Sequence, residues 1–116
     1  MKMSEFYQEL ESTKKKMKWS LVKPSPNSFR KELRAKFKSA PNSNKCFCPI
    51  TAVCYEKTGK YFPVSKVDEA NKFVGLHNRH RDRVVDGADN VSVNSYAYNN
   101  GKIVRKRLLK ALNLKD

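Results

Sequence analysis

Three cysteines and two histidines are the side chains of this sequence that could form a zinc site. The histidines are His77 and His80, and the cysteines are Cys46, Cys48 and Cys54. Structural zinc sites usually present cysteines as CxxC pairs, whereas here a CxC pair is followed by a single cysteine in a predicted helix. An odd number of cysteines also favours reduced thiols. We therefore expect no metal and no other cofactor, with Cys54 packed as a small hydrophobic residue.

Three aspartates could in principle serve a nuclease. Asp82, Asp86 and Asp89 recur at the spacing of one helix face, where they could hold a divalent cation. However, Arg79 and Arg83 lie within one turn of them, so a salt-bridged helix surface explains the same pattern. The sequence also lacks a glycine-rich phosphate loop and a Gly-x-Ser-x-Gly motif. We expect no catalytic residues and no enzymatic activity.

Residues 68–81 bear comparison with a helix-turn-helix motif, in which an alanine, a turn glycine and a recognition helix follow one another. Ala70 and Gly75 fit this order, but Val84 and Val85 come later than the tight turn allows. The second helix would carry Asn78, Arg79, His80, Arg81 and Arg83, which are types that contact phosphates and base edges. A DNA-reading helix and an ordinary helical hairpin both remain open.

The positive charge is concentrated in the two ends of the chain. The net charge is +14, from 25 Lys and Arg against 11 Asp and Glu. Residues 1–38 carry 11 basic and 4 acidic side chains, and residues 77–116 carry 9 and 4, whereas residues 39–76 carry only 5 and 3. Concentrated like charge opposes folding through self-repulsion, so it usually serves an acidic partner. Plain solubility is the alternative explanation.

Helical spacing places many of these charges opposite apolar stripes, such as Leu108 and Leu112 in the last helix. We expect the charged side chains to point outward and to act in binding rather than in folding. The predicted binding residues, for nucleic acid or another acidic partner, are Lys14, Lys15, Lys16, Lys18, Arg79, Arg81, Arg83, Lys102, Arg105, Lys106 and Lys110. Tyr96 and Tyr98 could also stack on bases.

The periodicity of apolar residues predicts a mainly α-helical single domain over residues 1–116. Within it we expect a basic N-terminal helix over residues 1–17. A hairpin or loop region should follow over residues 18–47, and a helical core should occupy residues 48–116.

Residues 29–38 fit both a helix and a strand. A strand that pairs with residues 19–22 is slightly preferred, which would give a short β-hairpin near residues 19–37. In the rest of the chain, capping residues and helix breakers indicate where helices begin and end. Helices are expected to start at Ser4, Pro49, Ser65, Asn78 and Asn99–Gly101 and to end near Met17, Gly59, Gly75 and Asp89–Asn90, with a loop over residues 91–100.

No stretch of the sequence approaches the roughly 18 apolar residues of a membrane span. Residues 1–17 also contain no apolar run of the kind that marks a signal peptide. We therefore expect a cytoplasmic protein that does not bind a membrane.

Several short motifs follow one another within residues 19–114: Trp19-x-Leu21, Cys48-Pro49-Ile50, Val74-Gly75-Leu76, Val84 to Asn90 and Arg107-Leu108-Leu109. Their order resembles that of small uncharacterised proteins of phages and prophages. The chain departs from the family pattern at Val74 and Gly87, where the pattern has Leu and Ala. The resemblance implies a phage-type context in the host cytoplasm, and it carries over no catalytic residue.

Two functional hypotheses follow. The first is a small, basic, non-enzymatic phage-type protein that binds nucleic acid, DNA rather than RNA, through basic helix faces. Its affinity would fall steeply with salt, because neutralised phosphates release counterions. The alternative is a phage-encoded inhibitor or adaptor that binds an acidic surface of a host or competitor protein or nucleoprotein.

Overall fold

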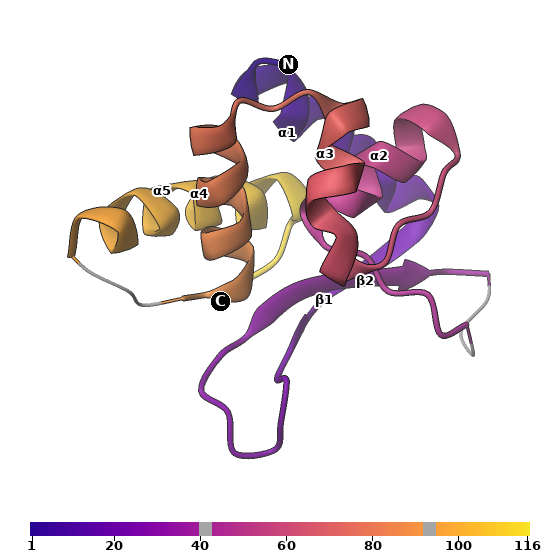
Figure 1. Cartoon of the computed structure of the whole chain (residues 1–116). Coiled ribbons are helices and arrows are strands. Elements are labelled where there is room, and N and C mark those ends of the chain that lie inside the picture. Colours follow the sequence, from indigo (N-terminus) through magenta and orange to yellow (C-terminus); the bar gives the residue numbers. More distant parts are fainter. Residues whose placement is uncertain (40–42, 92–94) are drawn as a thin grey trace.

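The computed structural model is a mainly helical domain with one two-stranded hairpin, as the sequence predicts (Figure 1). It describes residues 1–39, 43–91 and 95–116, the last range with side chains from Gly101 onward. The elements in chain order are α1 (Met3–Ser12), a 3-10 turn η1 (Thr13–Lys15), β1 (Met17–Val22), β2 (Glu32–Phe37), α2 (Pro49–Thr58), a 3-10 turn η2 (Val64–Lys66), α3 (Val67–Val74), α4 (Asn78–Asp89) and α5 (Ser95–Leu112).

The N-terminal helix is shorter than predicted because a buried threonine turns the chain. The hydroxyl of Thr13 donates to the carbonyl oxygen of Leu10 and accepts a hydrogen bond from Trp19 Nε1 at 2.9 Å. The chain then leaves the helix, and Met17, predicted to lie on it, begins β1 instead. The Met17 side chain still reaches the core, but from a strand.

Residues 29–38 contain a strand, which confirms the slightly preferred alternative. In the antiparallel register, Trp19 lies opposite Ala35 and Lys18 lies opposite Lys36. Successive side chains of a strand point to opposite faces. Trp19 and Ala35 are therefore buried in the core, whereas Lys18 and Lys36 are exposed on the other face of the hairpin.

Helix α2 begins and ends where the sequence predicts. Its N-cap is Cys48, whose Sγ accepts a hydrogen bond from the backbone N of Thr51 at 3.5 Å. In return, Thr51 Oγ1 accepts from the backbone N of Cys48 at 2.9 Å, which completes a capping box. Pro49 occupies the first helical position, and Gly59 ends the helix with a φ of 73°.

Three predicted caps lie inside their helices or turns instead. Ser4 is within α1, and Ser65 is within the η2 turn that precedes α3. Asn78 is the first residue of α4, where His77 is the cap because its Nδ1 accepts a hydrogen bond from the backbone N of Arg79 at 3.2 Å. An imidazole nitrogen thus does what the sequence assigned to an asparagine side chain.

The predicted ends of α3 and α4 are confirmed, but α5 begins earlier than predicted. Gly75 and Asn90 end the two helices with φ values of 82° and 54°. Residues 95–100, predicted to be a loop, belong to α5, while residues 92–94 lie outside the described residues. No helix in the described part of the chain, α5 included, has the length and apolar content needed to span a membrane.

Helices α4 and α5 cross in close contact at a pair of glycines. A Cβ atom added to Gly87 would lie 2.8 Å from the carbonyl oxygen of Gly101 and 3.1 Å from the backbone N of Arg105. Such a distance leaves no room for a side chain, so this crossing requires glycine. The crossing brings Arg105 against the last turn of α4.

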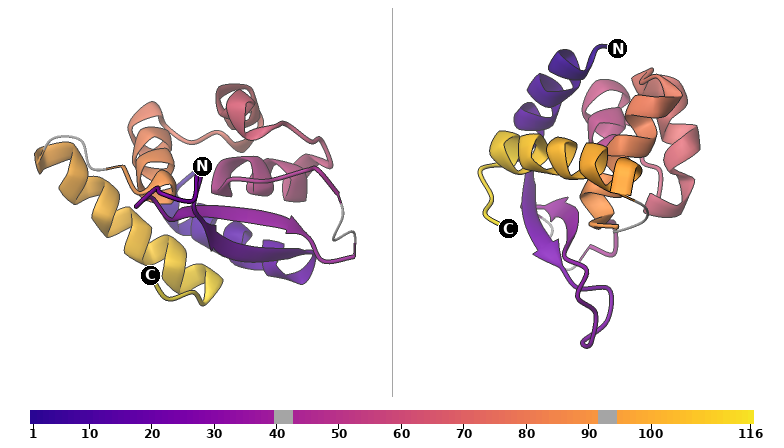
Figure 2. Two further views of the ribbon diagram at one scale, coloured as in Figure 1. Left: turned by 90° about the horizontal axis from the view of Figure 1, so that it is seen from below. Right: turned by 90° about the vertical axis from the view of Figure 1, so that its left-hand side faces the viewer.

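Buried side chains from the helices and both strands form one hydrophobic core. The largest fully buried ones include Phe6, Leu10, Met17, Leu33, Phe47, Ile50 and Leu108. Phe47 also extends the hairpin by one backbone bridge to Ala35, with both N–H···O distances at 2.9 Å. In contrast, the hairpin loop of residues 23–31 projects away from this core (Figure 2).

Candidate nucleic-acid interface

The solvent face of the hairpin places lysines directly opposite one another. Lys18 faces Lys36 across the two strands, and the backbone N of Lys38 donates to the carbonyl oxygen of Lys16 at 3.0 Å. All four residues are exposed. Like charges at opposite positions destabilise a hairpin. Within the described residues, none of the four forms an ion pair with a carboxylate, so the hairpin carries an uncompensated repulsion.

These lysines line a continuous basic surface. Lys18, Lys36 and Lys38 line an open groove of about 820 Å³. A more open depression of about 600 Å³ is lined by Lys14, Lys15 and again Lys38. Because Lys38 belongs to both, the two hollows form one surface, which we call the lysine groove: Lys14, Lys15, Lys18, Lys36 and Lys38.

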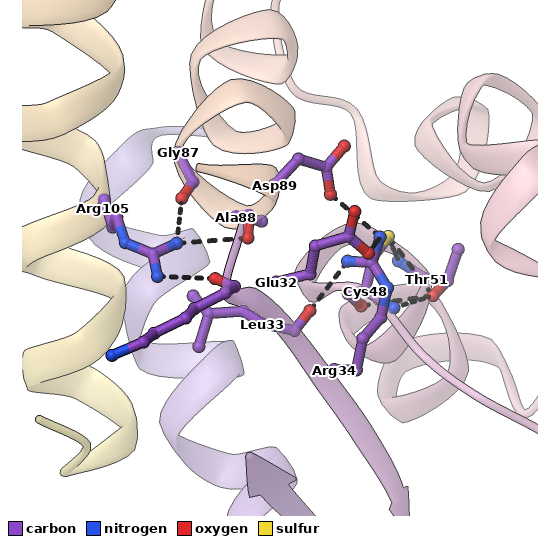
Figure 3. A network of polar contacts seen from close by, with 10 residues as sticks. Glu32, Leu33, Arg34, Cys48, Thr51, Gly87, Ala88, Asp89 and Arg105 are labelled. Carbon is purple, nitrogen blue, oxygen red and sulfur yellow. Dashed lines mark hydrogen bonds and ion pairs between the residues drawn. The ribbon is translucent and has the colours of Figure 1, made fainter. Parts of the chain in front are cut away.

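The other charged groups bordering the lysine groove have different roles. Glu11 lines the depression, and Arg34 lines the groove on the side of the helices. Arg34 Nη2 forms an ion pair with Glu32 of the same strand at 2.8 Å and a second one with Asp89 at 2.9 Å (Figure 3). The second pair ties β2 to the last residue of α4. Arg34 therefore holds the hairpin on the helices, while the lysines remain available to a partner.

The thiol of Cys48 lies beside this network and is buried. Burial raises the pKa of Cys48, although hydrogen bonds from Thr51 and the positive charge of Arg34 act in the opposite direction. The protonated thiol serves as the cap of α2. Cys54 is buried in the core, as predicted. Among the residues with described side chains, no three His, Cys, Asp or Glu groups gather in a way that could hold a metal ion.

Arg105 is buried, so its predicted outward position is wrong. Only 4% of its surface is exposed. Its guanidinium donates to the carbonyl oxygens of Gly87 at 2.7 Å, Ala88 at 3.2 Å and Lys31 at 2.7 Å (Figure 3). It also forms an ion pair with Asp116 at 2.9 Å. Arg105 is therefore part of the fold and not of a binding surface.

The three arginines predicted to bind from α4 are Arg79, Arg81 and Arg83. Arg81 forms ion pairs with Asp68 at 3.2 Å and Asp82 at 3.0 Å. Arg79 lies in the first turn of α4, whereas the residue that reaches the hairpin is Asp89 at the other end, about 15 Å along the helix. None of the three arginines lines the groove or the depression that make up the lysine groove.

Helices α3 and α4 do not form the compact unit of a helix-turn-helix motif. Helix α3 packs mainly against α2, and α4 packs mainly against α5. In a helix-turn-helix, the two consecutive helices support each other so that the second can enter a DNA groove. The sequence order of Ala70 and Gly75 therefore does not produce this motif.

Helix α5 carries a second basic surface. Lys102, Lys106 and Lys110 are exposed, as predicted. The helix packs mainly on α4 and α1, and the guanidinium of Arg107 lies over the ring of Tyr7 at 4.9 Å. These lysines form a stripe distinct from the lysine groove. The predicted stacking residues Tyr96 and Tyr98 have side chains that lie outside the described residues.

The sequence-based prediction missed Lys36, Lys38 and Phe29. The two lysines alternate with apolar residues in the sequence, but only the strand register shows that Lys36 lies opposite Lys18. Phe29, in the projecting loop, is 97% exposed. In the sequence, Phe29 stands between turn-forming residues and basic residues, which could have indicated an exposed aromatic ring. The same segment also fits a helix, so this pattern was not distinctive.

Comparison of the chain with protein-family models, curated proteins and solved structures finds no match. The resemblance to phage and prophage proteins therefore stays a prediction. What the protein does has to be inferred from its own surface.

Proposed function

We propose that this is a non-enzymatic protein that binds the phosphate backbone of DNA in the lysine groove. The observation that supports this most is the opposition of Lys18 and Lys36 without a carboxylate partner. A phosphate between these ammonium groups would replace a repulsion by two attractions. Each neutralised phosphate would also release condensed counterions, which favours binding irrespective of sequence.

The spacing of the lysines suits an extended polyanion. Lys36 lies on β2 and Lys38 directly follows the strand, and both line the same groove. Two residues of extended chain span about 7 Å, so that each lysine can contact a separate phosphate. Lys14 and Lys15 continue the basic surface beyond the end of the hairpin. Contacts of this kind position a nucleic acid without reading its bases. Consistent with the phage resemblance, we place this activity in the cytoplasm of a host cell.

The test compares two triple variants that remove the same charge. The groove variant combines Lys18→Gln, Lys36→Gln and Lys38→Gln, and the control variant combines Lys57→Gln, Lys72→Gln and Lys115→Gln, at exposed sites outside the groove. DNA affinity is measured from low to moderate salt. For the groove variant we expect lower affinity and a salt slope reduced by about 0.9 for each phosphate that is no longer neutralised. The control should change little.

Two results would refute the proposal: no DNA binding by the wild type at physiological salt, or equal decreases of affinity in both variants. In the first case the inhibitor or adaptor hypothesis takes its place, with the same groove facing an acidic protein surface. A pull-down from nuclease-treated lysate then checks that hypothesis, because an acidic protein partner would be retained by the wild type and released by the groove variant.

A further inference from the structure

The hairpin loop presents an aromatic ring to solvent among cations. Phe29 is 97% exposed, and the next two residues, Arg30 and Lys31, are exposed as well. Lys23 lies at the other end of the loop, which projects from the body of the protein (Figure 2). The fold gains nothing from this ring, because the ring packs against none of the core. A partner that buries it would remove this apolar surface from water, which favours binding.

The backbone on either side of this ring is held in place. The backbone N of Arg30 donates to Ser28 Oγ at 3.1 Å, so a local turn encloses Phe29. The carbonyl oxygen of Lys31 accepts a hydrogen bond from the buried Arg105 at 2.7 Å, which anchors the end of the loop to the helices. A loop held in this way loses little conformational entropy when it binds.

We propose, building on the function proposed above, that Phe29 inserts from the minor groove of duplex DNA between two stacked base pairs. Apolar side chains act as such wedges in proteins that partly unstack and bend the duplex. Arg30 and Lys31 contact the phosphates that border the wedge, while the lysine groove holds the neighbouring backbone.

The hairpin favours this partner over single-stranded nucleic acid. Binding to a single strand relies on several aromatic rings on which successive bases stack. The lysine-lined groove has the half-buried ring of Phe37 in its wall, but that ring packs on Phe47 and Tyr55. The loop of residues 23–31 offers Phe29 as its single ring, and that ring is fully exposed. One ring among cations fits one opened base step.

The test uses two short duplexes that differ in one central mismatch, with 2-aminopurine beside that step. A mismatch lowers the free-energy cost of unstacking the base pairs at that step. We therefore expect the wild type to bind the mismatched duplex about tenfold more tightly, equivalent to about 1.4 kcal/mol, and to raise the 2-aminopurine fluorescence. Phe29→Ala should keep DNA binding, its salt slope and its melting temperature, but lose both the preference and the fluorescence change.

Ile103→Ala is the matched control, because it also removes an exposed apolar side chain, 63% accessible, from a different element. It should behave as the wild type. If the wild type binds DNA but shows no mismatch preference, or if Phe29→Ala retains it, the wedge is wrong while the proposed function stands. If the wild type binds neither duplex, the proposed function itself is wrong.

Two further outcomes would also overturn the wedge. One is a preference for single-stranded DNA that depends on Phe29, which would indicate stacking on unpaired bases. The other is Phe29-dependent binding to vesicles that contain phosphatidylserine, without any 2-aminopurine response. Both are measured with the same three proteins.

Discussion

A buried guanidinium is stable only when its donors are paired, and Arg105 meets this requirement with groups from three parts of the chain. The carbonyls of Gly87 and Ala88 belong to the last turn of α4, where they have no partner within the helix. The carbonyl of Lys31 and the carboxylate of Asp116 complete the set. One side chain thus caps a helix, fixes the base of the hairpin loop and ties down the C-terminal residue.

Replacing Arg105 should therefore destabilise the fold. Arg105→Gln leaves buried carbonyl groups without donors and should lower the free energy of unfolding by about 2–4 kcal/mol. Arg105→Lys should also destabilise, because an ammonium group lacks the planar fork of donors. Urea denaturation measures both. The exposed neighbour provides the control, since Lys106→Gln should stay within about 0.5 kcal/mol; a similarly small effect for Arg105→Gln would contradict this role.

Two carboxylates should respond to pH with opposite signs. Desolvation, reinforced by Asp82 and Asp89, raises the pKa of Asp86. Asp86 therefore favours the fold only when protonated, and that contribution is lost as pH rises through its folded pKa. The hydrogen bond from Arg105 lowers the pKa of Asp116. Ionised Asp116 therefore stabilises the fold at pH values above its pKa in the unfolded chain, about 3.9. This stabilisation is lost as the pH falls through the pKa in the folded protein.

We expect Asp86→Asn to raise the melting temperature at pH 7 and Asp116→Asn to lower it. Both differences should shrink towards pH 3, where the wild-type carboxyl groups become protonated. Thermal unfolding followed by circular dichroism between pH 3 and pH 7 measures this. If both variants changed the melting temperature in the same direction at pH 7, the opposite effects assigned to the surroundings of Asp86 and Asp116 would be wrong.

At the scale of elements, the sequence predicts those helix and strand bounds that depend on residues within the same segment. The bounds of α2 follow from Pro49 and Gly59, which act on their own segment. The end of α1 could not be predicted in this way, because it depends on the hydrogen bond between Thr13 and Trp19 across the turn. The apolar alternation indicated β2, but it did not give the register.

The candidate site follows the same division. Lys14, Lys15 and Lys18 could be singled out as a run of charge, whereas Lys36 and Lys38 join them only through strand pairing. Arg105 was misplaced by its helical spacing with the exposed lysines of α5. Its burial depends on the space beside Gly87 and on contacts with Lys31 and Asp116. Gly87 and Lys31 are distant from Arg105 in the sequence, and Asp116 lies beyond the end of α5, so the spacing within the helix could not indicate them.

The crossing of α4 and α5 makes its two glycines unequal. Gly87→Ala should destabilise the fold by about 1–3 kcal/mol, because the new Cβ would meet backbone atoms at 2.8 Å and 3.1 Å. Gly101→Ala should be neutral or stabilising by up to about 1 kcal/mol, since its nearest neighbour lies at 3.5 Å and alanine favours a helix. Urea denaturation of both variants decides; equal effects would show that the helices are not in contact here.

At the scale of the whole molecule, the +14 charge is divided among separate surfaces. The lysine groove, the α4 arginines and the α5 stripe of Lys102, Lys106 and Lys110 lie on different elements. Self-repulsion of this size opposes the compact state. An anionic partner or dissolved salt should therefore stabilise the fold without any change in its core packing.

We accordingly expect the melting temperature to rise with sodium chloride, because about 0.1 M salt screens charges beyond roughly 10 Å. DNA affinity should fall over the same range. The groove variant, which already lacks three of the charges, should show a smaller rise. A melting temperature that falls with salt would mean that ion pairs such as Arg34–Asp89 outweigh the repulsion.

The single tryptophan of the chain lies at the joint between α1 and the hairpin, buried and bonded through its indole N–H to Thr13. It is on the opposite face of β1 from the lysines. Its emission therefore serves as a built-in optical probe. Opening of the joint exposes the indole to water and shifts the emission to longer wavelength, whereas an anion that occupies the groove leaves the indole buried and the colour of its emission unchanged.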